Sequence, residues 1–358
     1  MKPRERIITT LYHEEPDKVP FFDFLYNEIS IRKLLGETKR IRVTSEMYMK
    51  AQLMLGFDHV VIFFDPPEGY KPARASNDII VSASGTKSRV IDDMAWYIGG
   101  TIKTSEDLDN WQPPDPYAPG RTRTIRRLLK KYGEEIALGT SIGGVFTDAW
   151  MMTGFDVFVK AMYTNPSFIH RLMDILTKNA VELGKIAIDE GIEFLWIADD
   201  FGDNHGPMVT PDKFRRFILP YLKRQVEILK KRGAWVFLHC DGNVNILMDD
   251  IVNTGIDAFH PCERKARMNL AVIKQKYGDK ITLFGNVEAS NLIPFGSYKE
   301  IDKQIRECFD IAAPGGGYIF GSDHSIHPGI PPEKARFLFN QAQKYREYSK
   351  VSIKSLAE

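Results

Sequence analysis

Short apolar runs alternate with amphipathic stretches along most of the chain, and this alternation predicts strands separated by helices. Strands of a parallel sheet are buried on both faces, so they read as continuous apolar runs. The predicted strands are 19–24, 59–64, 136–139, 193–198, 235–238, 256–259, 281–284 and 318–320. Eight strands with intervening helices predict an α/β protein with the (β/α)8 TIM-barrel fold, built as one domain over residues 1–358.

The stretch 78–103 has a different pattern, because apolar and polar residues alternate around Gly85 and the Gly99-Gly100 pair. A period of two with glycines at the turns indicates a β-hairpin. The stretch follows the second predicted strand. We therefore expect an inserted β-arm on the second βα loop, where barrel enzymes carry elements that cover the substrate.

The helical segments carry recognisable start and stop signals. Residues 4–13 form an amphipathic pattern, a second helical stretch follows the first strand through Met54, and Ser297 with Glu300 forms a capping box. A doubly wound open sheet is the alternative architecture, but no GxGxxG motif follows the first strand. The pattern therefore favours the barrel.

Composition narrows the classes of partner. The formal net charge is +1, from 48 Lys and Arg against 47 Asp and Glu, so neither nucleic-acid binding nor membrane-surface binding is expected. No apolar run approaches the roughly 18 residues of a membrane span. Three cysteines do not indicate a disulfide framework, and the N-terminus lacks the apolar core of a signal peptide. We expect a cytoplasmic protein.

Polar side chains follow several predicted strands, at the barrel end where active sites lie. His239 and Asp241 are two residues apart after the fifth strand, so in extended chain they share one face. Glu263 after the sixth strand and either Asp323 or His324 after the eighth could complete a metal site. Nitrogen and carboxylate ligands suit zinc, and also iron or manganese. The alternative is a hydrogen-bonded polar layer without a metal.

Other polar residues at the strand ends are candidates for acid–base chemistry. Asp200 follows the fourth strand and is the preferred general acid or base. Asp23, near the end of the first strand, is a second catalytic candidate. His324 is a candidate both for catalysis and for metal binding. His205 is as well explained by a turn as by catalysis. Cys240 alternates out of phase with His239, which predicts a thiol facing the helix layer.

An apolar group after the third strand predicts one wall of a substrate pocket, although ordinary packing beneath a loop would have the same pattern. The residues expected to contact the substrate are Phe146, Trp150, Met151, Asp199, His205 and Asn243.

Four segments carry a family resemblance. RERIITTLYHEEPDKVP, DDFGDNHGPMVTPDKFRRFILPYLK, LHCDGNV and GGGYIFGSDHSIHP are similar to the uroporphyrinogen decarboxylase superfamily, over nearly the whole chain. The superfamily includes porphyrinogen decarboxylases, zinc-dependent methyltransferases that work with corrinoid proteins and, more distantly, cobalamin-independent methionine synthases. The resemblance implies a TIM-barrel enzyme.

The chain departs from both main branches. The decarboxylases carry an arginine-rich segment after the first strand, whereas this region reads FFDFLYNEIS and has no arginine until Arg32. The methyltransferases carry His-x-Cys after the fifth strand and a cysteine after the eighth. Here Asp241 stands at the first cysteine position, His324 lies near the second, and Glu263 stands 22 residues after Asp241, as a glutamate does in the methionine synthases.

Replacement of thiolates by harder ligands leaves a bound zinc a stronger Lewis acid, suited to an ether oxygen. The resemblance therefore implies a methyltransferase that moves a methyl group from a methoxylated substrate to the cobalt of a corrinoid (cobalamin) on a partner protein. Aromatic methyl ethers are among the substrates that this interpretation includes. One alternative is a decarboxylase of a smaller acid, with Asp23 or Asp200 stabilising a protonated intermediate. Another is a non-catalytic barrel that docks a corrinoid protein. The sequence leaves a homodimer open.

Overall fold

The computed structural model describes residues 1–76, 78–91 and 94–348, which fall into two compact units. The first unit comprises Met1–Val60, Glu134–Ala137 and Ala258–Glu358, and the second comprises Val61–Gly133 and Leu138–Asp257. Each unit contains parallel strands separated by helices, which is the α/β pattern of the predicted TIM-barrel fold. Whether the two units act as one domain stays a prediction.

The second unit is built on three neighbouring parallel strands. β6 (Ala137–Ser141) pairs with β7 (Phe194–Ala198), which pairs with β8 (Trp235–His239). Their residues are almost entirely buried, as the apolar runs predict. The helices between and around them are α4 (Ser105–Asn110), α5 (Arg123–Tyr132), α6 (Val145–Thr153), α7 (Phe155–Thr164), α8 (Pro166–Asp189), α9 (Pro211–Phe217), α10 (Leu219–Lys231), the 3₁₀ turn Asn245–Leu247 and α11 (Met248–Val252).

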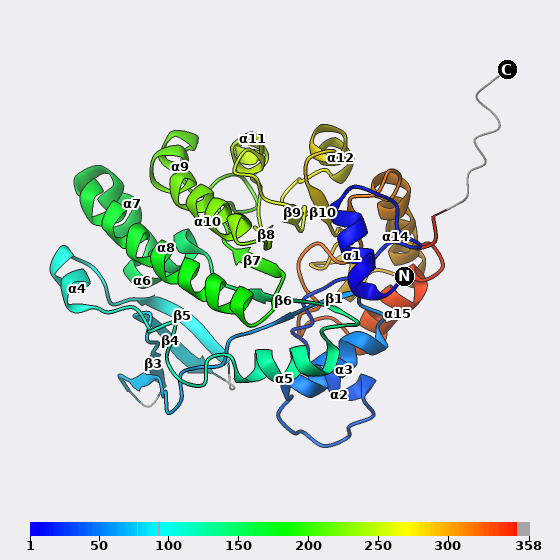
Figure 1. Ribbon diagram of the computed structural model, residues 1–358, viewed down its shortest axis with the longest axis horizontal. Coiled ribbons are helices and arrows are strands. Elements are labelled where there is room, and N and C mark those ends of the chain that lie inside the picture. The colour runs from blue at the N-terminus through cyan, green and yellow to red at the C-terminus, as the bar shows by residue number, and fades with distance from the viewer. Residues whose placement is uncertain (77, 92–93, 349–358) are drawn as a thin grey trace. The chain divides into compact units, whose positions relative to one another are not determined.

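The predicted β-arm is an antiparallel sheet of four strands (Figure 1), consisting of β2 (Ala73–Arg74), β3 (Ile79–Val81), β4 (Thr86–Ile91) and β5 (Met94–Gly100). The insertion after β1 is confirmed, but it begins before the predicted residue 78. The end of the arm joins α6, because the Ile102 amide donates to the Met152 carbonyl at 3.0 Å. A Cβ on Gly100 would lie 1.9 Å from that same oxygen, so only glycine permits this approach.

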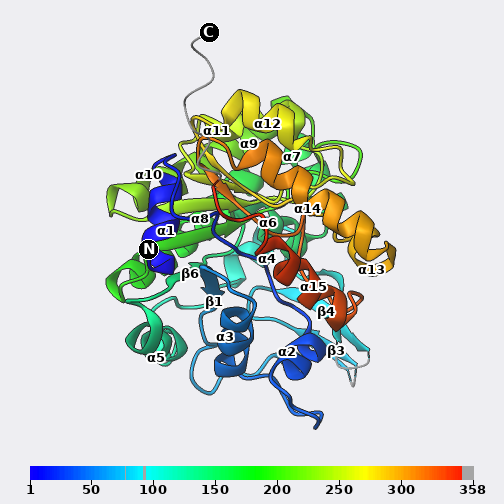
Figure 2. The ribbon, with the colours of Figure 1, turned by 90° about the vertical axis from the view of Figure 1, so that its right-hand side faces the viewer.

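The first unit carries β9 (Ala258–His260), β10 (Thr282–Phe284) and β11 (Tyr318–Ile319), paired in parallel in that order. Strand β1 spans His59–Ile62. Figure 2 shows α14 and α15 side by side on this unit. Its helices are α1 (Pro3–Leu11), α2 (Glu28–Leu34), α3 (Ser45–Met54), α12 (Leu270–Tyr277), α13 (Leu292–Phe295), α14 (Tyr298–Ala312) and α15 (Pro332–Ala342).

The prediction of a regular first strand over 19–24 is wrong. The segment runs parallel to β11 but forms only an isolated bridge, between Phe21 and Phe320. Pro20 has no amide to donate, and the Phe21 amide donates to the Asp58 carboxylate at 2.8 Å instead of to a strand. The ladder is therefore interrupted, although the segment occupies a strand's place.

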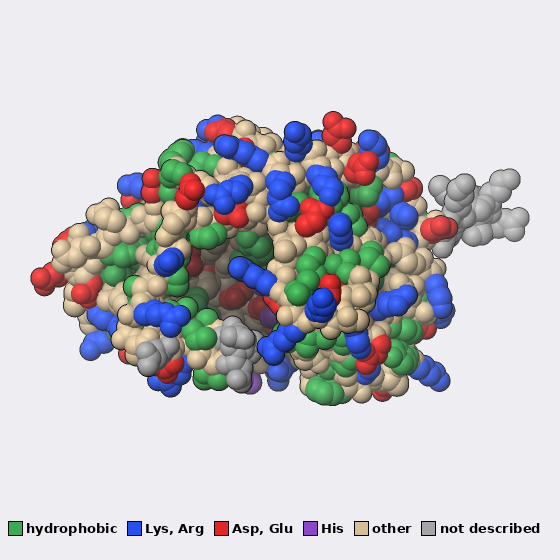
Figure 3. All heavy atoms as spheres, turned by 90° about the horizontal axis from the view of Figure 1, so that it is seen from below, with side chains coloured by type: hydrophobic (Ala, Val, Ile, Leu, Met, Phe, Trp, Pro, Cys, Tyr) green, Lys and Arg blue, Asp and Glu red, His purple; other side chains and the backbone are tan. Residues whose placement is uncertain are grey.

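The helical stretch predicted through Met54 is two helices, α2 and α3. The connecting segment 35–44 is rich in charge, and the Thr44 hydroxyl begins α3 by accepting the Met47 amide at 3.2 Å. Lys and Arg side chains are interspersed with Asp and Glu over the face in Figure 3, as the small net charge predicts. Over the described residues, no helix has the length and apolar content needed to cross a membrane.

Candidate functional site

The carboxyl ends of β7 and β8 lie side by side in the second unit. Ala198 stands opposite His239 in the parallel register, and the Asp199 amide donates to the His239 carbonyl at 2.9 Å. The chain that leaves each strand therefore starts from the same edge of the sheet. This arrangement carries Asp200 and Asp241 to the same place from two different loops.

A close contact between glycines holds those two loops together. Gly242 has a φ of +86°, and a Cβ there would lie 2.3 Å from the carbonyl carbon of Gly202. One residue on, the Asn243 amide donates to the Asp203 carbonyl at 2.6 Å. Only glycine supplies both the positive φ and the space. The loops are thus locked to each other immediately beside the carboxylates.

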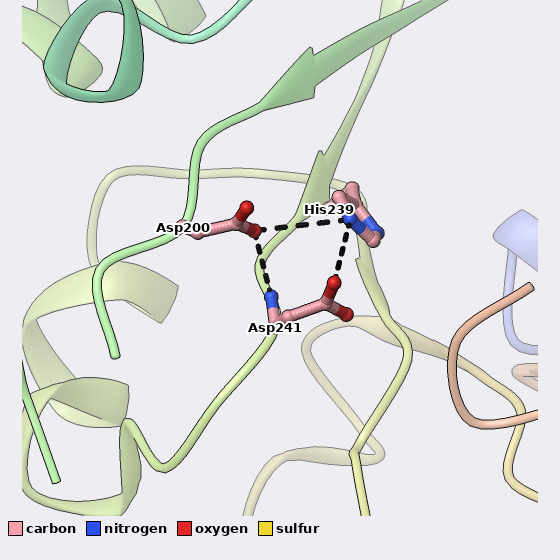
Figure 4. Close-up of side chains that lie close together, drawn as sticks. All are labelled: Asp200, His239 and Asp241. Carbon is pink, nitrogen blue, oxygen red and sulfur yellow. Dashed lines mark hydrogen bonds and ion pairs between the residues drawn. The ribbon is translucent and has the colours of Figure 1, made fainter. Parts of the chain in front are cut away.

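Asp200, His239 and Asp241 form a compact cluster, with their side chains directed at one another (Figure 4). Nε2 of His239 lies 3.4 Å from Oδ2 of Asp241 and 3.8 Å from Oδ1 of Asp200. The Asp241 amide donates to the same Asp200 oxygen at 2.9 Å. The His239 side chain is 14% exposed, so the group is accessible without being fully solvated.

The geometry of this cluster fits a divalent metal ion. One ligand atom from each residue lies within 4.8 Å of the others. Ligands about 2.0–2.1 Å from a tetrahedral zinc ion stand about 3.3 Å from one another, which is close to the separations from His239. Three protein ligands leave one position for a substrate atom. The predicted pairing of His239 with Asp241 therefore occurs in the structure, and Asp200 joins them as a third candidate ligand.

Cys240 lies between His239 and Asp241 but faces away from them. Its side chain is buried, and its Sγ accepts the Phe201 amide at 3.2 Å. Burial raises the pKa of this thiol well above its ordinary value, so the thiolate that binds metals is disfavoured. The predicted burial of Cys240 is confirmed, and its orientation toward the helix layer stays a prediction.

Asp199 has a different role from the adjacent Asp200. Its carboxylate accepts the amides of Phe146 at 3.0 Å and Thr147 at 2.7 Å, which caps the N-terminus of α6. Burial raises the pKa of Asp199 to about 7. The Asp200 amide in turn donates to the Thr147 hydroxyl at 3.1 Å. Asp199 thus couples α6 to the cluster. The residue is 1% exposed, and the substrate contact that the sequence suggested stays a prediction.

The expected apolar wall divides into core and surface. Phe146 is fully buried against Phe158 and Phe201, at ring-centroid distances of 5.5 and 6.0 Å, which matches the packing alternative. Trp150 and Met151 are only partly buried. Trp150 meets Tyr97 of the β-arm edge-to-face, with ring centroids 5.5 Å apart. The arm and α6 therefore share an aromatic contact.

The two remaining substrate candidates of this unit lie in turns. The exposed His205 donates its amide to Oδ1 of Asp203 at 2.7 Å, which matches the turn alternative for this residue. Asn243 accepts the Asn245 amide on its side-chain oxygen at 3.2 Å. The His205 backbone amide and the Asn243 side chain each make hydrogen bonds within their own loop, and a contact with substrate stays a prediction for both residues.

The sequence prediction overlooked one carboxylate near these strand ends. Asp148 stands in the first turn of α6, with Oδ2 3.1 Å from where a Cβ of Gly143 would be, and the Gly143 carbonyl accepts the Ala198 amide at the end of β7. The residue is exposed, but desolvation by the protein atoms around its carboxyl group raises the pKa of Asp148 to about 6. A lone acid in the apolar run VFTDAWMM was the available signal.

The predicted residues of the first unit fall into two groups. Asp323 is buried, and its two oxygens accept the amides of Arg264 at 2.9 Å and Ala289 at 2.8 Å. His324 is exposed, with Nδ1 2.7 Å from the Ser325 hydroxyl, and Glu263 is buried. Between Asp323 and His324, the histidine has the more accessible donor atoms. Metal binding by Glu263 and His324 stays a prediction.

Asp23 is also enclosed in the first unit. Its side chain accepts the Ser322 amide at 2.8 Å and the Ser322 hydroxyl at 3.1 Å. Burial raises the pKa of Asp23 to about 7, and these two hydrogen bonds oppose the rise. The carboxyl can therefore hold or release a proton near neutral pH, as a catalytic acid must.

Comparisons with known proteins agree with this fold. The model of the family described as "Uroporphyrinogen decarboxylase (URO-D)" matches residues 2–345. The uroporphyrinogen decarboxylase of Pseudoalteromonas atlantica is 27% identical over 259 residues, which cover 68% of this chain and 69% of that protein. The Myxococcus xanthus uroporphyrinogen decarboxylase is 25% identical over 317 residues, covering 85% and 83%.

A solved structure extends the similarity to the fold. A methyltransferase from Methanosarcina mazei superposes with a TM-score of 0.71 at 18% identity, covering 96% of this chain and 99% of that one. At this identity the likeness shows that the two chains share a fold.

Proposed function

Because the chain belongs to the uroporphyrinogen decarboxylase family, we propose that it is a methyltransferase that moves a methyl group from a methoxylated substrate to the cobalt of a corrinoid on a partner protein. The observation that carries the proposal is the cluster of Asp200, His239 and Asp241, which offers nitrogen and oxygen ligands while Cys240 turns away. The fold shared with the Methanosarcina methyltransferase is consistent with it.

The donor set decides which methyl donor suits the cluster. A zinc ion held by Asp200, His239 and Asp241 would supply Lewis acidity to an ether oxygen, since it would lack electron-rich thiolates. Thiol substrates are better served by softer ligands. An oxygen-linked methyl group therefore fits these residues better than a sulfur-linked one.

The chain itself contributes positioning and proton supply. The contacts of Asp200 with the Thr147 hydroxyl and the Asp241 amide hold its carboxylate in place. Trp150 and Tyr97 provide an aromatic surface near α6 against which the substrate can be oriented. We propose Asp148, which stands in the first turn of α6 and has a raised pKa, as the residue that holds the proton needed by the departing oxygen.

Decarboxylation of a smaller acid is the alternative, and the names of the curated relatives favour it. The position of Arg32 argues against a substrate with many carboxylates, because it is the first arginine after the 19–24 segment. It is engaged by Glu28 at 3.0 Å and by the Ile41 carbonyl at 3.0 Å. The resemblance to the decarboxylases implies cations for propionate groups in that region, and here its first arginine is already paired.

Metal analysis of protein purified without chelators tests the central observation. We expect stoichiometric metal in the wild type and its loss in His239→Ala. The matched control is His205→Ala, which removes an exposed histidine from the neighbouring loop and should leave the metal content unchanged. Equal metal content in the two variants, or none in the wild type, would contradict the proposed site.

The reaction class is tested by mixing the protein with a reduced corrinoid protein and candidate methyl donors. We expect methylcobalamin absorbance to develop with methyl ethers, and to a lesser extent or not at all with thioethers and amines. Absence of methyl transfer from every donor, together with release of CO₂ from a small carboxylic acid, would establish the decarboxylase alternative instead.

A further inference from the structure

The second unit contains a large groove that the proposed reaction does not use. Its volume is about 1000 Å³, and it is lined by the segment 116–123, the outer face of α5 and the last turn of α8. Glu190 on this groove precedes β7, whereas Asp200 follows it. A strand of this length spans about 16 Å, so the groove is a separate site from the ligand cluster.

Positive charge predominates on the walls of the groove. Arg126 is neutralised by Glu190, with its Nε and Nη2 atoms 2.6–2.8 Å from the carboxylate oxygens. Asp189 is paired with Arg232 at 2.7 Å. These pairs leave Glu68 as the remaining carboxylate of the lining. The lining cations are Arg121, Arg123, Arg126, Arg127 and Lys130.

Arg121 is the residue in the lining that most strongly indicates an anionic ligand. Its Nε is buried and has no hydrogen-bond acceptor among the described residues. Its guanidinium lies 5.6 Å from the ring centroid of Phe64, and its carbonyl accepts the Asp65 amide at 2.9 Å, so the residue is held in place. Burial lowers the pKa of Arg121 from its ordinary value, which reflects incomplete compensation of its charge. An anion bound in the groove would compensate the charge of this guanidinium, which lines the groove.

We propose that this groove binds a phosphate-bearing small molecule of about the size of a nucleotide. Guanidinium groups match phosphate oxygens in pairs, and several cations around one space favour an anion of more than one charge. The volume far exceeds that of inorganic phosphate and lies at the upper end of small-molecule pockets. Tyr117 lines the groove and is 63% exposed, so a planar group has a surface on which to stack.

Calorimetric titration of the full chain tests this site without any methyl-transfer assay. The probes are inorganic phosphate and a nucleoside diphosphate, with chloride as the control at matched ionic strength. We expect saturable binding of both phosphates and tighter binding of the nucleotide. Since each charged contact carries a large share of such binding, Arg121→Gln should weaken it by about tenfold.

Two exposed lysines on α5 provide a matched pair of variants. Lys130 lines the groove and Lys131 does not, so Lys130→Gln should weaken binding and Lys131→Gln should leave it unchanged. Arg123→Gln, at an exposed residue of the groove, serves if Arg121→Gln is unstable.

Binding that equals the chloride control, or that falls equally in the lysine variants, would overturn the site and identify α5 as an ordinary solvated face. Binding of inorganic phosphate without tighter nucleotide binding would overturn the nucleotide-sized assignment.

Discussion

Replacing Asp199 by asparagine tests whether a buried carboxyl makes the stability of this protein fall as the pH rises. The carboxyl is 1% exposed, and burial raises its folded-state pKa from 3.8 to about 7. A raised pKa means that the folded state holds the proton more tightly than the unfolded chain. The stabilisation from that proton is complete below the unfolded pKa and is lost as the pH rises through the folded pKa.

The size of the effect follows from the two pKa values. Protonation linkage with pKa values of 3.8 and about 7 gives a loss of roughly 2–3 kcal/mol in the free energy of unfolding between about pH 5 and pH 8. Asp23 and Asp323 have pKa values raised in the same direction. Their contributions occur in both wild type and variant, so they cancel in the difference.

Urea denaturation of both proteins at about pH 5 and pH 8 measures this difference. Asparagine cannot accept both α6 amides, so Asp199→Asn is expected to be less stable at the acidic pH by about 1–3 kcal/mol. Its stability should nevertheless depend less on pH than that of the wild type. An unchanged pH dependence in Asp199→Asn would refute the reasoning.

Asp203→Asn is the matched control for this measurement. Asp203 is a nearby aspartate whose pKa is lowered by the amides of His205 and Gly206. Its stabilisation is lost only as the pH falls through that lowered value, below the window of the measurement. The control should therefore retain the wild-type pH dependence between pH 5 and pH 8.

Three further substitutions have expected outcomes. Gly242→Ala adds a Cβ at a φ of +86° against the neighbouring loop, so it should lower stability by about 1–3 kcal/mol in thermal melts and reduce metal content; a normal melt and normal metal content would contradict this. Asp58→Ala leaves Arg6 and Arg346 buried without their shared carboxylate, and should cost about 3–5 kcal/mol in urea denaturation. Cys240→Ala should retain the wild-type metal content, because the thiol faces away from the cluster; loss of metal would make the thiol a ligand.

The sequence by itself determined the repeating order of strands and helices, the inserted β-arm and the pairing of His239 with Asp241. These features depend on local periodicity: continuous apolar runs become buried strands, and residues two apart in extended chain share a face. The same periodicity placed Cys240 on the opposite side. Each of these predictions needed only the few residues around it.

The tertiary structure decided the different roles of the two acidic residues at the end of β7. Asp199 and Asp200 are adjacent and chemically identical, yet one caps α6 and the other joins His239 and Asp241. That choice depends on the register between β7 and β8 and on the packing of α6, both of which are made by residues distant in sequence.

The irregular segment 19–24 is a second case in which contacts between distant residues override the local sequence pattern. Its apolar run predicts a strand, but the Phe21 amide is taken by Asp58, which is 37 residues away. Hydrogen bonds between distant segments compete with the local preference for a regular ladder, and a pattern along the chain does not reveal the competitor. The sequence therefore determined the segments that build the candidate site, and the structure decided which of their oxygens remain available to a ligand.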